Sequence, residues 1–271
     1  MDNLSDLQRV QLDLLREFVS ICEREKLRYY LVEGSMLGAV RHKGFIPWDD
    51  DIDVAMPRED YNIFLKKAKE LSQPYKLTTF MDDEHYWMTA ILWNTDVKVL
   101  MTNATESIEK FAWIDVIPLD GMPDGKVSQK LHYMHFYYYR ALFQASNFSK
   151  IVNVNRPRPF HERFFIKLFQ IFPLEKMLNS RRIGMRMHRI MSKYDFDKSN
   201  FAIQMISDYK MKELVPREWF GEGKMIQFEN LKVSGVLNAD AYLSQIYGEY
   251  MKMPPEEKRV GKHSITLIKK D

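Results

Sequence analysis

The segment at residues 34–54 restricts the fold of this chain more than any other part of it. A small-residue turn, Gly34-Ser35, precedes a cluster of aspartates: Asp49, Asp50, Asp51 and Asp53. The apolar residues Ile52 and Val54 alternate with the last two aspartates, which predicts a strand over 51–55. Because successive strand side chains point to opposite faces, the two carboxylates share one face while Ile52 and Val54 enter the core.

This arrangement has a chemical use. Two carboxylates on one face of a strand lie roughly 7 Å apart and can share a divalent metal ion, while the turn beside them can seat a phosphate group. A calcium-binding EF-hand would also place aspartates at loop positions 1, 3 and 5, but that loop needs Gly at position 6 and Glu at position 12. Val54 and Asp60 stand at these positions, so the EF-hand is excluded and phosphoryl transfer is favoured.

Longer motifs around the aspartates resemble a known family. Gly34-Ser35 followed by Asp51-Ile-Asp-Val54 resembles the signature of the polymerase-beta-like nucleotidyltransferase fold. The chain is similar to the LicD family in three further strings: Leu-Gly-Ala-Val-Arg (37–41), Gly-Phe-Ile-Pro-Trp-Asp-Asp-Asp-Ile-Asp (44–53) and Trp-Ile-Asp-Val-Ile-Pro-Leu-Asp-Gly (113–121). The similarity runs from Leu27 to His263. That family includes bacterial phosphocholine transferases and is related to the fukutin-type ribitol-phosphate transferases.

A metal site of this kind usually needs a third carboxylate, and Asp115 is the best candidate. It lies between Ile114 and Val116 in an apolar segment, where an unpaired buried carboxylate would be costly. The family resemblance points to the same residue, and a purely structural Asp115 is the alternative. Asp115 could also help to deprotonate the acceptor hydroxyl. The predicted catalytic residues and ligands of Mg²⁺ or Mn²⁺ are therefore Asp51, Asp53 and Asp115.

Other residues are predicted to bind substrate. Arg41 has a planar guanidinium that matches phosphate oxygens, although Asp49 or Asp50 could instead be its partner. Ser35 and the backbone N–H groups beside Gly34 would hold phosphate oxygens. Asp49 and Asp50 would orient these groups or contact substrate directly.

The resemblance also implies sites for the rest of a nucleotide donor. A choline headgroup cannot donate ordinary hydrogen bonds and is best held by aromatic rings. Trp48, beside the aspartates, is the leading wall of such a cage, with Trp87 and Trp93 as further candidates and core packing as the alternative for each. Near the C-terminus, Arg259 or His263 would reach the nucleotide phosphates.

Composition bears on the class of protein. The chain has 271 residues, of which 45% are hydrophobic, and a net charge of only +3, so there is no global electrostatic case for nucleic-acid binding. The single Cys22 cannot form an internal disulfide, and no stretch approaches the ~20 apolar residues of a membrane span. The N-terminus lacks the features of a signal peptide. We expect a cytoplasmic protein, with peripheral contact at the inner face of the cell membrane left open.

The pattern of apolar residues predicts an α/β (α+β) fold, a nucleotidyltransferase-like mixed sheet backed by helices with an additional aromatic-rich helical region. Ser5 and Gln8 fit a capping box ahead of a helix over 6–26, and Pro57 fits the first turn of another. Strands are expected at 29–32, 51–55, 76–80, 88–93, 97–101 and 113–117. The predicted division is a catalytic core at 1–125, a helical, aromatic and basic appendage at 126–222, and a C-terminal segment returning to the core at 223–271.

Two aromatic segments lie in the predicted appendage. Residues 128–146 carry many Tyr, His and Phe side chains and no acidic residue, and residues 160–172 place phenylalanines on one helical stripe. Ordinary packing between two helices is one explanation. The other is a membrane-interfacial surface, because Tyr favours the headgroup layer and basic residues favour anionic lipids.

The resemblance implies a reaction. It is the metal-dependent transfer of phosphocholine from CDP-choline to a sugar hydroxyl of a teichoic-acid or other cell-surface glycan precursor, with CMP leaving and with an acceptor that is expected to be lipid-linked. Three alternatives stay open: a CDP-ribitol or CDP-glycerol donor, a small-molecule nucleotidyltransferase, and a catalytically silent membrane-peripheral scaffold. The intact carboxylates argue against the scaffold.

Overall fold

The computed structural model describes residues 4–82, 87–101, 108–148, 177–261 and 265–268. The α-helices are α1 (Asp6–Glu25), α2 (Glu33–His42), α3 (Arg58–Lys67), α4 (Lys126–Ser146), α8 (Ser180–Met191) and α9 (Ala239–Tyr247). The strands are β1 (Tyr30–Leu31), β2 (Asp53–Pro57), β3 (Tyr75–Thr78), β4 (Ala90–Met101), β5 (Ile108–Met122), β6 (Phe201–Ile203), β7 (Val215–Pro216), β8 (Lys224–Phe228), β9 (Leu231–Gly235) and β10 (Ile265–Leu267). The short 3-10 helices are η1 (Ala68–Glu70), η2 (Lys210–Glu213), η3 (Arg217–Trp219) and η4 (Glu256–Lys258).

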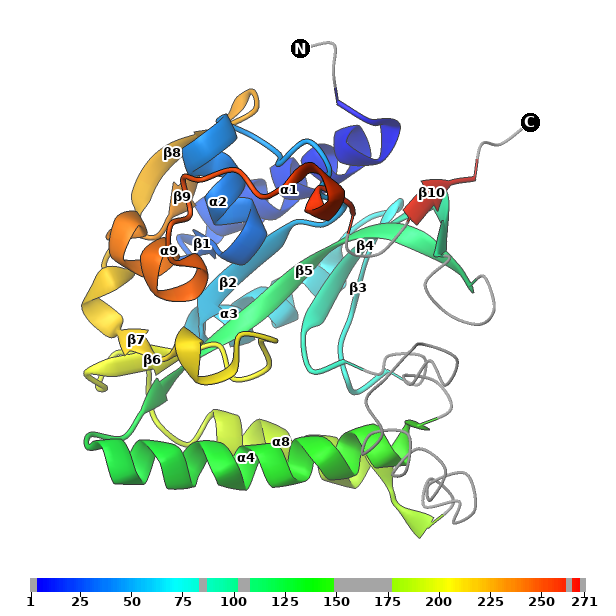
Figure 1. The fold of residues 1–271 in the computed structure, drawn as a ribbon. Coiled ribbons are helices and arrows are strands. Elements are labelled where there is room, and N and C mark those ends of the chain that lie inside the picture. The colour runs from blue at the N-terminus through cyan, green and yellow to red at the C-terminus, as the bar shows by residue number, and fades with distance from the viewer. Residues whose placement is uncertain (1–3, 83–86, 102–107, 149–176, 262–264, 269–271) are drawn as a thin grey trace.

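A ten-stranded mixed sheet forms the centre of the molecule (Figure 1). Its main path runs β10-β4-β5-β2-β1-β9-β8, with β3 paired to β4, β6 paired to β5, and β7 paired to β6. The pairs β2/β5 and β1/β9 are parallel, while β1/β2 and β4/β5 are antiparallel. The predicted α/β class with a mixed sheet backed by helices is therefore confirmed.

Helix α1 begins at the predicted capping box. The Ser5 hydroxyl oxygen accepts from the Gln8 backbone N–H at 3.1 Å, and the Gln8 side chain accepts from the Ser5 backbone N–H at 3.1 Å. The fully buried Phe18 of α1 packs on Phe64 of α3 with 5.0 Å between ring centroids. These two helices cover the face of the sheet into which Val54 of β2 points.

Three predicted elements differ in the structure. Gly34-Ser35 is not a tight turn but the first turn of α2, because Met36, Leu37 and Ala39 form a buried helical face immediately after it. Strand β2 begins at Asp53 rather than at residue 51, so Asp51 precedes the strand. The strands expected at 88–93 and 97–101 are one strand, β4, with an irregularity between Asn94 and Lys98, since the long strand β5 pairs with both parts.

Helices α4 and α8 lie side by side at one end of the molecule (Figure 1). They enclose a second apolar cluster that includes Tyr133, Phe136, Phe143, Ile183 and Met187. Helix α4 agrees with the predicted aromatic segment at 128–146, whereas the segment at 160–172 falls outside the described residues. The predicted division at residues 125 and 222 stays a prediction. Among the helices described, none has the length and apolar character needed to cross a membrane.

Candidate active site

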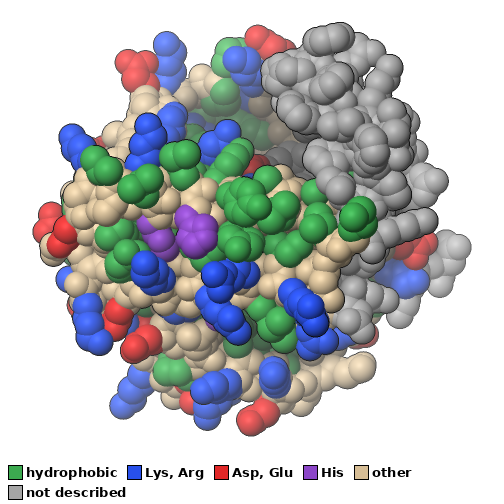
Figure 2. Space-filling model, turned by 90° about the horizontal axis from the view of Figure 1, so that it is seen from below, with side chains coloured by type: hydrophobic (Ala, Val, Ile, Leu, Met, Phe, Trp, Pro, Cys, Tyr) green, Lys and Arg blue, Asp and Glu red, His purple; other side chains and the backbone are tan. Residues whose placement is uncertain are grey.

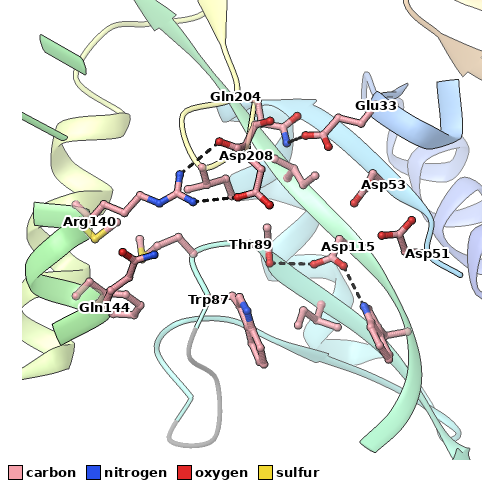
Figure 3. A pocket seen from close by; sticks show the side chains of 18 of the residues that line it. Glu33, Asp51, Asp53, Trp87, Thr89, Asp115, Arg140, Gln144, Gln204 and Asp208 are labelled. Atoms are coloured by element: carbon pink, nitrogen blue, oxygen red, sulfur yellow. Dashed lines mark hydrogen bonds and ion pairs between the residues drawn. The ribbon is translucent and has the colours of Figure 1, made fainter. Parts of the chain in front are cut away.

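Asp53 and Asp115 lie side by side on neighbouring strands. Parallel pairing of β2 with β5 sets Asp53 opposite Asp115 and Val54 opposite Val116. Paired residues on adjacent strands share a face, so both carboxylates project from the face opposite to α1 and α3. Asp51 precedes β2 and lines the same pocket (Figure 3). All three carboxylates that the sequence singles out therefore line one pocket.

Two neighbours fix the orientation of the Asp115 carboxylate. The Thr89 hydroxyl donates to Oδ1 at 3.1 Å, and the Trp113 indole Nε1–H donates to Oδ2 at 3.0 Å (Figure 3). These bonds offset the cost of removing a carboxylate from water, and the two oxygens of a carboxylate together offer about four acceptor sites. The sequence did not predict a role for Thr89 or Trp113, although Trp113 lies two residues before Asp115 and so shares its face.

Ser35 holds the start of β2, the strand that carries Asp53. Its hydroxyl oxygen accepts from the Asp53 backbone N–H at 2.9 Å, and its side chain is buried. The neighbouring Gly34 lies against the Asp49 carboxylate, because a Cβ at this position would lie 2.8 Å from Asp49 Oδ2. Both residues thus pack around the aspartates. Their predicted phosphate contacts stay predictions.

Asp49, Asp50 and Asp51 form a closer cluster, in which one carboxylate oxygen from each lies within 4.8 Å of the others. Helix α1 supports this loop: the amides of Gln8 and Gln11 donate to the backbone oxygens of Asp49 and Asp50 at 3.1 and 2.8 Å. A cluster of carboxylate oxygens could hold a hard divalent cation. Asp51 belongs both to this cluster and to the pocket that Asp53 and Asp115 line.

The carboxylates stand at one end of a pocket of about 410 Å³. The sheet forms its floor, where Trp113, Asp115 and Ile117 of β5 alternate with residues of the core. On the neighbouring strand β4, Trp93 is paired with Trp113 and Ile91 with Asp115. Its walls come from distant parts of the chain: Glu33 of α2, Arg140, Phe143 and Gln144 of α4, Met187 of α8, and Gln204, Ile206, Ser207 and Asp208 after β6 (Figure 3).

One side of the pocket is aromatic. The rings of Trp93 and Trp113 lie 6.0 Å apart between centroids, and the Lys110 ammonium lies 4.0 Å from the Trp87 ring centroid. Burial lowers the pKa of Lys110 to about 8, and the negative charge of Asp115 opposes this effect in part. The Trp87 face therefore already accepts an alkylammonium group.

Trp48 lies elsewhere. The centroids of the Trp48 and His42 rings lie 6.3 Å apart in a T-shaped arrangement, and the guanidinium carbon of Arg259 lies 5.8 Å from the Trp48 centroid. Trp48 is not among the residues that line the pocket. Arg259 also donates to the Pro254 carbonyl at 2.9 Å, and Arg41 donates to the Tyr250 carbonyl at 2.9 Å. The structure does not bring Trp48, Arg41 or Arg259 to the pocket that holds the carboxylates. His263 falls outside the described residues.

Glu33 is a pocket residue that the sequence analysis missed. Its carboxylate accepts from the Gln204 amide at 2.5 Å. Its backbone has φ 46°, a left-handed conformation that is costly for a residue with a side chain. Only one feature of the sequence could have indicated a site at Glu33. The residue lies between a buried strand and Gly34, and functional side chains often follow the end of a strand.

A buried network extends from Glu33 away from the pocket. The Glu33 backbone N–H donates to the Tyr242 hydroxyl at 3.3 Å, and that hydroxyl donates to Glu213 at 3.2 Å. Burial raises the pKa of Glu213 to about 8, and the charge of Glu33 adds to the effect. Glu213 therefore holds its proton near neutral pH.

Comparison with known proteins agrees with this geometry. Residues 26–177 match the family model described as LicD/FKTN/FKRP, nucleotidyltransferase domain. The chain is 30% identical over 266 residues to the lipopolysaccharide cholinephosphotransferase LicD of Haemophilus influenzae, and the alignment covers 96% of each protein. The chain belongs to the LicD family. As a LicD-family member it is a phosphotransferase that acts in phosphocholine or related phosphoalcohol transfer.

Two shorter matches extend the comparison. The chain is 47% identical over 45 residues to the ribitol 5-phosphate transferase FKRP of Homo sapiens, which covers 17% of this LicD-family chain and 9% of that protein. It is also 38% identical over 66 residues to an uncharacterised Rickettsia typhi protein, over 23% and 21% of the two chains. Both matches are confined to part of the chain.

Proposed function

We propose that this LicD-family protein transfers phosphocholine from CDP-choline to a sugar hydroxyl of a teichoic-acid or other cell-surface glycan precursor and releases CMP. One observation carries the proposal: a single pocket joins the carboxylates Asp51, Asp53 and Asp115 to an aromatic side built by Trp87 and Trp93. The relative over nearly the whole length, named a cholinephosphotransferase, supports the same donor. We place the reaction at the inner face of the cell membrane, where a lipid-linked acceptor would be reached.

We propose that Asp51, Asp53 and Asp115, which line one pocket, would hold a divalent metal. Each ligand is a carboxylate oxygen, and hard cations such as Mg²⁺ or Mn²⁺ prefer such ligands. When bound there, the cation would neutralise the charge that develops on the donor phosphates and on the departing CMP. The bonds from Thr89 and Trp113 would hold the Asp115 carboxylate in place for this role.

In the proposed reaction, the oxygen of the acceptor hydroxyl forms a new bond to the phosphorus of phosphocholine, and the bond from that phosphorus to the CMP oxygen breaks. The proton of the hydroxyl passes to a carboxylate. Asp115 is the predicted acceptor of this proton. Glu33 lines the same pocket, and Gln204 holds its Oε1, so Glu33 is a second candidate.

The aromatic side favours choline. A trimethylammonium group interacts with ring faces through cation–π contacts of about 0.5–2 kcal/mol each. The Lys110 ammonium already lies 4.0 Å from the Trp87 centroid, so a choline bound on that ring face would take its place. Met88 and Ile91 add apolar surface beside these rings, which suits methyl groups better than the hydroxyls of a polyol.

Ribitol or glycerol phosphate is the second candidate for the transferred group. The FKRP match and the polar residues of the same pocket support it, because Arg140, Gln144 and Asp208 could bond to a polyol.

Measuring CMP release from purified protein distinguishes these donors. With Mg²⁺ present, we expect release from CDP-choline to exceed release from CDP-ribitol and CDP-glycerol at least tenfold, and EDTA to abolish it. If the protein released CMP faster from CDP-ribitol, ribitol phosphate would replace phosphocholine as the proposed transferred group. Absence of CMP release from every donor, with acceptor glycan supplied, would reject both.

A further inference from the structure

The outer face of α4 carries an apolar stripe that is exposed to solvent. Val127, Leu131, Met134 and Tyr138 recur at intervals of four, three and four residues, which places them on one side of a helix. Their exposed fractions are 74, 62, 58 and 60%. Figure 2 shows apolar side chains gathered on this face of the molecule, beside Lys and Arg side chains.

The inner face of α4 is already packed. Tyr133, Phe136 and Phe143 are buried against Ile183 and Met187 of α8 in the second apolar cluster. The stripe is therefore not the side that holds the helix to the protein. Helix α4 is apolar on two sides, and one of them contributes nothing to the described core.

The charged side chains of α4 and α8 all have one sign. Helices α4 and α8 contain no Asp or Glu. Exposed basic side chains occur along both helices and just beyond: Lys126, Lys130, Arg181, Arg182, Arg186, Arg189 and Lys193. Because the whole chain has a net charge of only +3, this face is strongly enriched in positive charge.

We propose that the stripe on α4 and the basic side chains of α8 dock the protein on an anionic lipid bilayer. Leu, Met and Val side chains would enter the acyl boundary, Tyr138 would lie at the headgroup level, and long basic side chains would reach the lipid phosphates. A negative membrane surface complements a patch of this charge. The contact is peripheral, since no described helix is long and apolar enough to span a membrane.

The same helices connect this surface to the pocket. Arg140, Phe143 and Gln144 of α4 and Met187 of α8 line the pocket from the side opposite to the stripe. Docking would therefore hold the pocket within one helix diameter of the lipid headgroups, roughly 10 Å. This consequence rests on the proposed function, because it concerns a lipid-linked acceptor, whereas the docking itself does not.

Co-sedimentation with vesicles tests the docking surface. We expect the protein to bind vesicles of phosphatidylcholine with 30% phosphatidylglycerol (about one anionic lipid in three, as suits a strongly negative surface), and to bind pure phosphatidylcholine vesicles much more weakly. Leu131→Glu with Met134→Glu should weaken binding more than tenfold, because two apolar side chains lose their burial. Arg181→Gln with Arg182→Gln should weaken it about fivefold per lost charge.

A matched control uses two equally exposed apolar residues far from α4. Met225→Glu with Met251→Glu changes the net charge by the same amount, and these side chains are 59 and 58% exposed. The control variant should bind anionic vesicles as the wild type does. The proposal would be overturned if the α4 variant bound vesicles as well as the wild type does. It would also be overturned if the control variant lost as much binding as the α4 variant. So would a wild type that ignores vesicles but forms dimers that the α4 variant abolishes.

The docking surface and the proposed function can fail separately. Circular dichroism should show that the α4 variant is folded, and CMP release from soluble CDP-choline should match the wild type. If vesicle binding follows the stripe while no donor releases CMP, docking stands and the proposed function falls. If CMP is released but the substitutions in the stripe do not change vesicle binding, the proposed function stands and docking falls.

Discussion

The carboxylates of Asp53 and Asp115 lie together because two parallel strands place them in register. Sequence predicted this pair, since each Asp alternates with apolar residues in a strand. The supporting bond from Thr89 could not be predicted, because Thr89 and Asp115 are 26 positions apart in the chain. Trp48 was wrongly predicted to lie beside the pocket because it is adjacent to the aspartates in sequence. Its ring instead lies against His42 and Arg259.

Replacing one carboxylate tests its role in turnover. Asp53→Asn keeps the size of the side chain and removes its charge, so we expect CMP release to fall about a thousandfold or more while the fold persists. Circular dichroism and CMP release are the measurements. Asp96→Asn, at an exposed site on β4, is the control and should change activity less than twofold. Appreciable residual activity of Asp53→Asn would refute the assignment.

The two tryptophans can be compared directly. Trp87→Ala should raise KM for CDP-choline about 3- to 30-fold, which corresponds to the loss of one cation–π contact, and should leave KM for CDP-ribitol nearly unchanged. Trp48→Ala serves as the matched variant and should have little effect on either KM. A larger effect from Trp48→Ala would restore the cage that the sequence predicted around Trp48.

At the scale of elements, local sequence patterns were sufficient to predict α1 and the positions of the central strands. The start of α1 depends on Ser5 and Gln8 alone, which is why the capping box was predictable. The turn at Gly34-Ser35 was wrong because small residues also occur where a helix begins close to another segment, here beside Asp49. Nothing local indicates that Arg58, at the start of α3, reaches Asp120 of β5.

That buried ion pair should be essential to the junction of α3 with β5. Arg58 donates two hydrogen bonds to Asp120 at 2.7 and 2.6 Å, and both residues are buried. Asp120→Ala leaves a buried guanidinium without its partner, so we expect the free energy of unfolding in urea to fall by about 3–5 kcal/mol. Arg58→Met with Asp120→Leu should recover most of the loss. A loss below about 1 kcal/mol for Asp120→Ala would contradict this account.

Glu213, at the end of η2, links stability to pH. Its pKa in the folded protein is raised above the unfolded value of 4.5, to about 8. The native state therefore binds this proton more tightly, and the associated stability is present at low pH and is lost as pH rises through about 8. The stability of the wild type relative to Glu213→Gln should fall between pH 5 and pH 9, as measured by urea unfolding. A constant or rising difference would show that Glu213 is charged in the native state.

At the scale of the whole molecule, the pocket depends on contacts that no local pattern encodes. The sequence identifies its floor, because alternation in β5 marks Trp113, Asp115 and Ile117 as one face. Its walls come from α2, α4, α8 and the segment after β6, which only the tertiary fold brings together. Glu33 and Gln204 were missed for this reason: their pairing joins residues 171 positions apart.

The central claim is that Asp51, Asp53 and Asp115 bind a divalent cation at the end of this pocket. Anomalous diffraction from crystals grown with Mn²⁺ and CDP-choline tests it most directly. We expect a manganese peak within about 2.2 Å of oxygens from Asp51, Asp53 and Asp115, adjacent to the donor phosphates, and no such peak in Asp53→Asn crystals. A peak held instead by Asp49 and Asp50 outside the pocket, or donor bound with no manganese at Asp115, would contradict it.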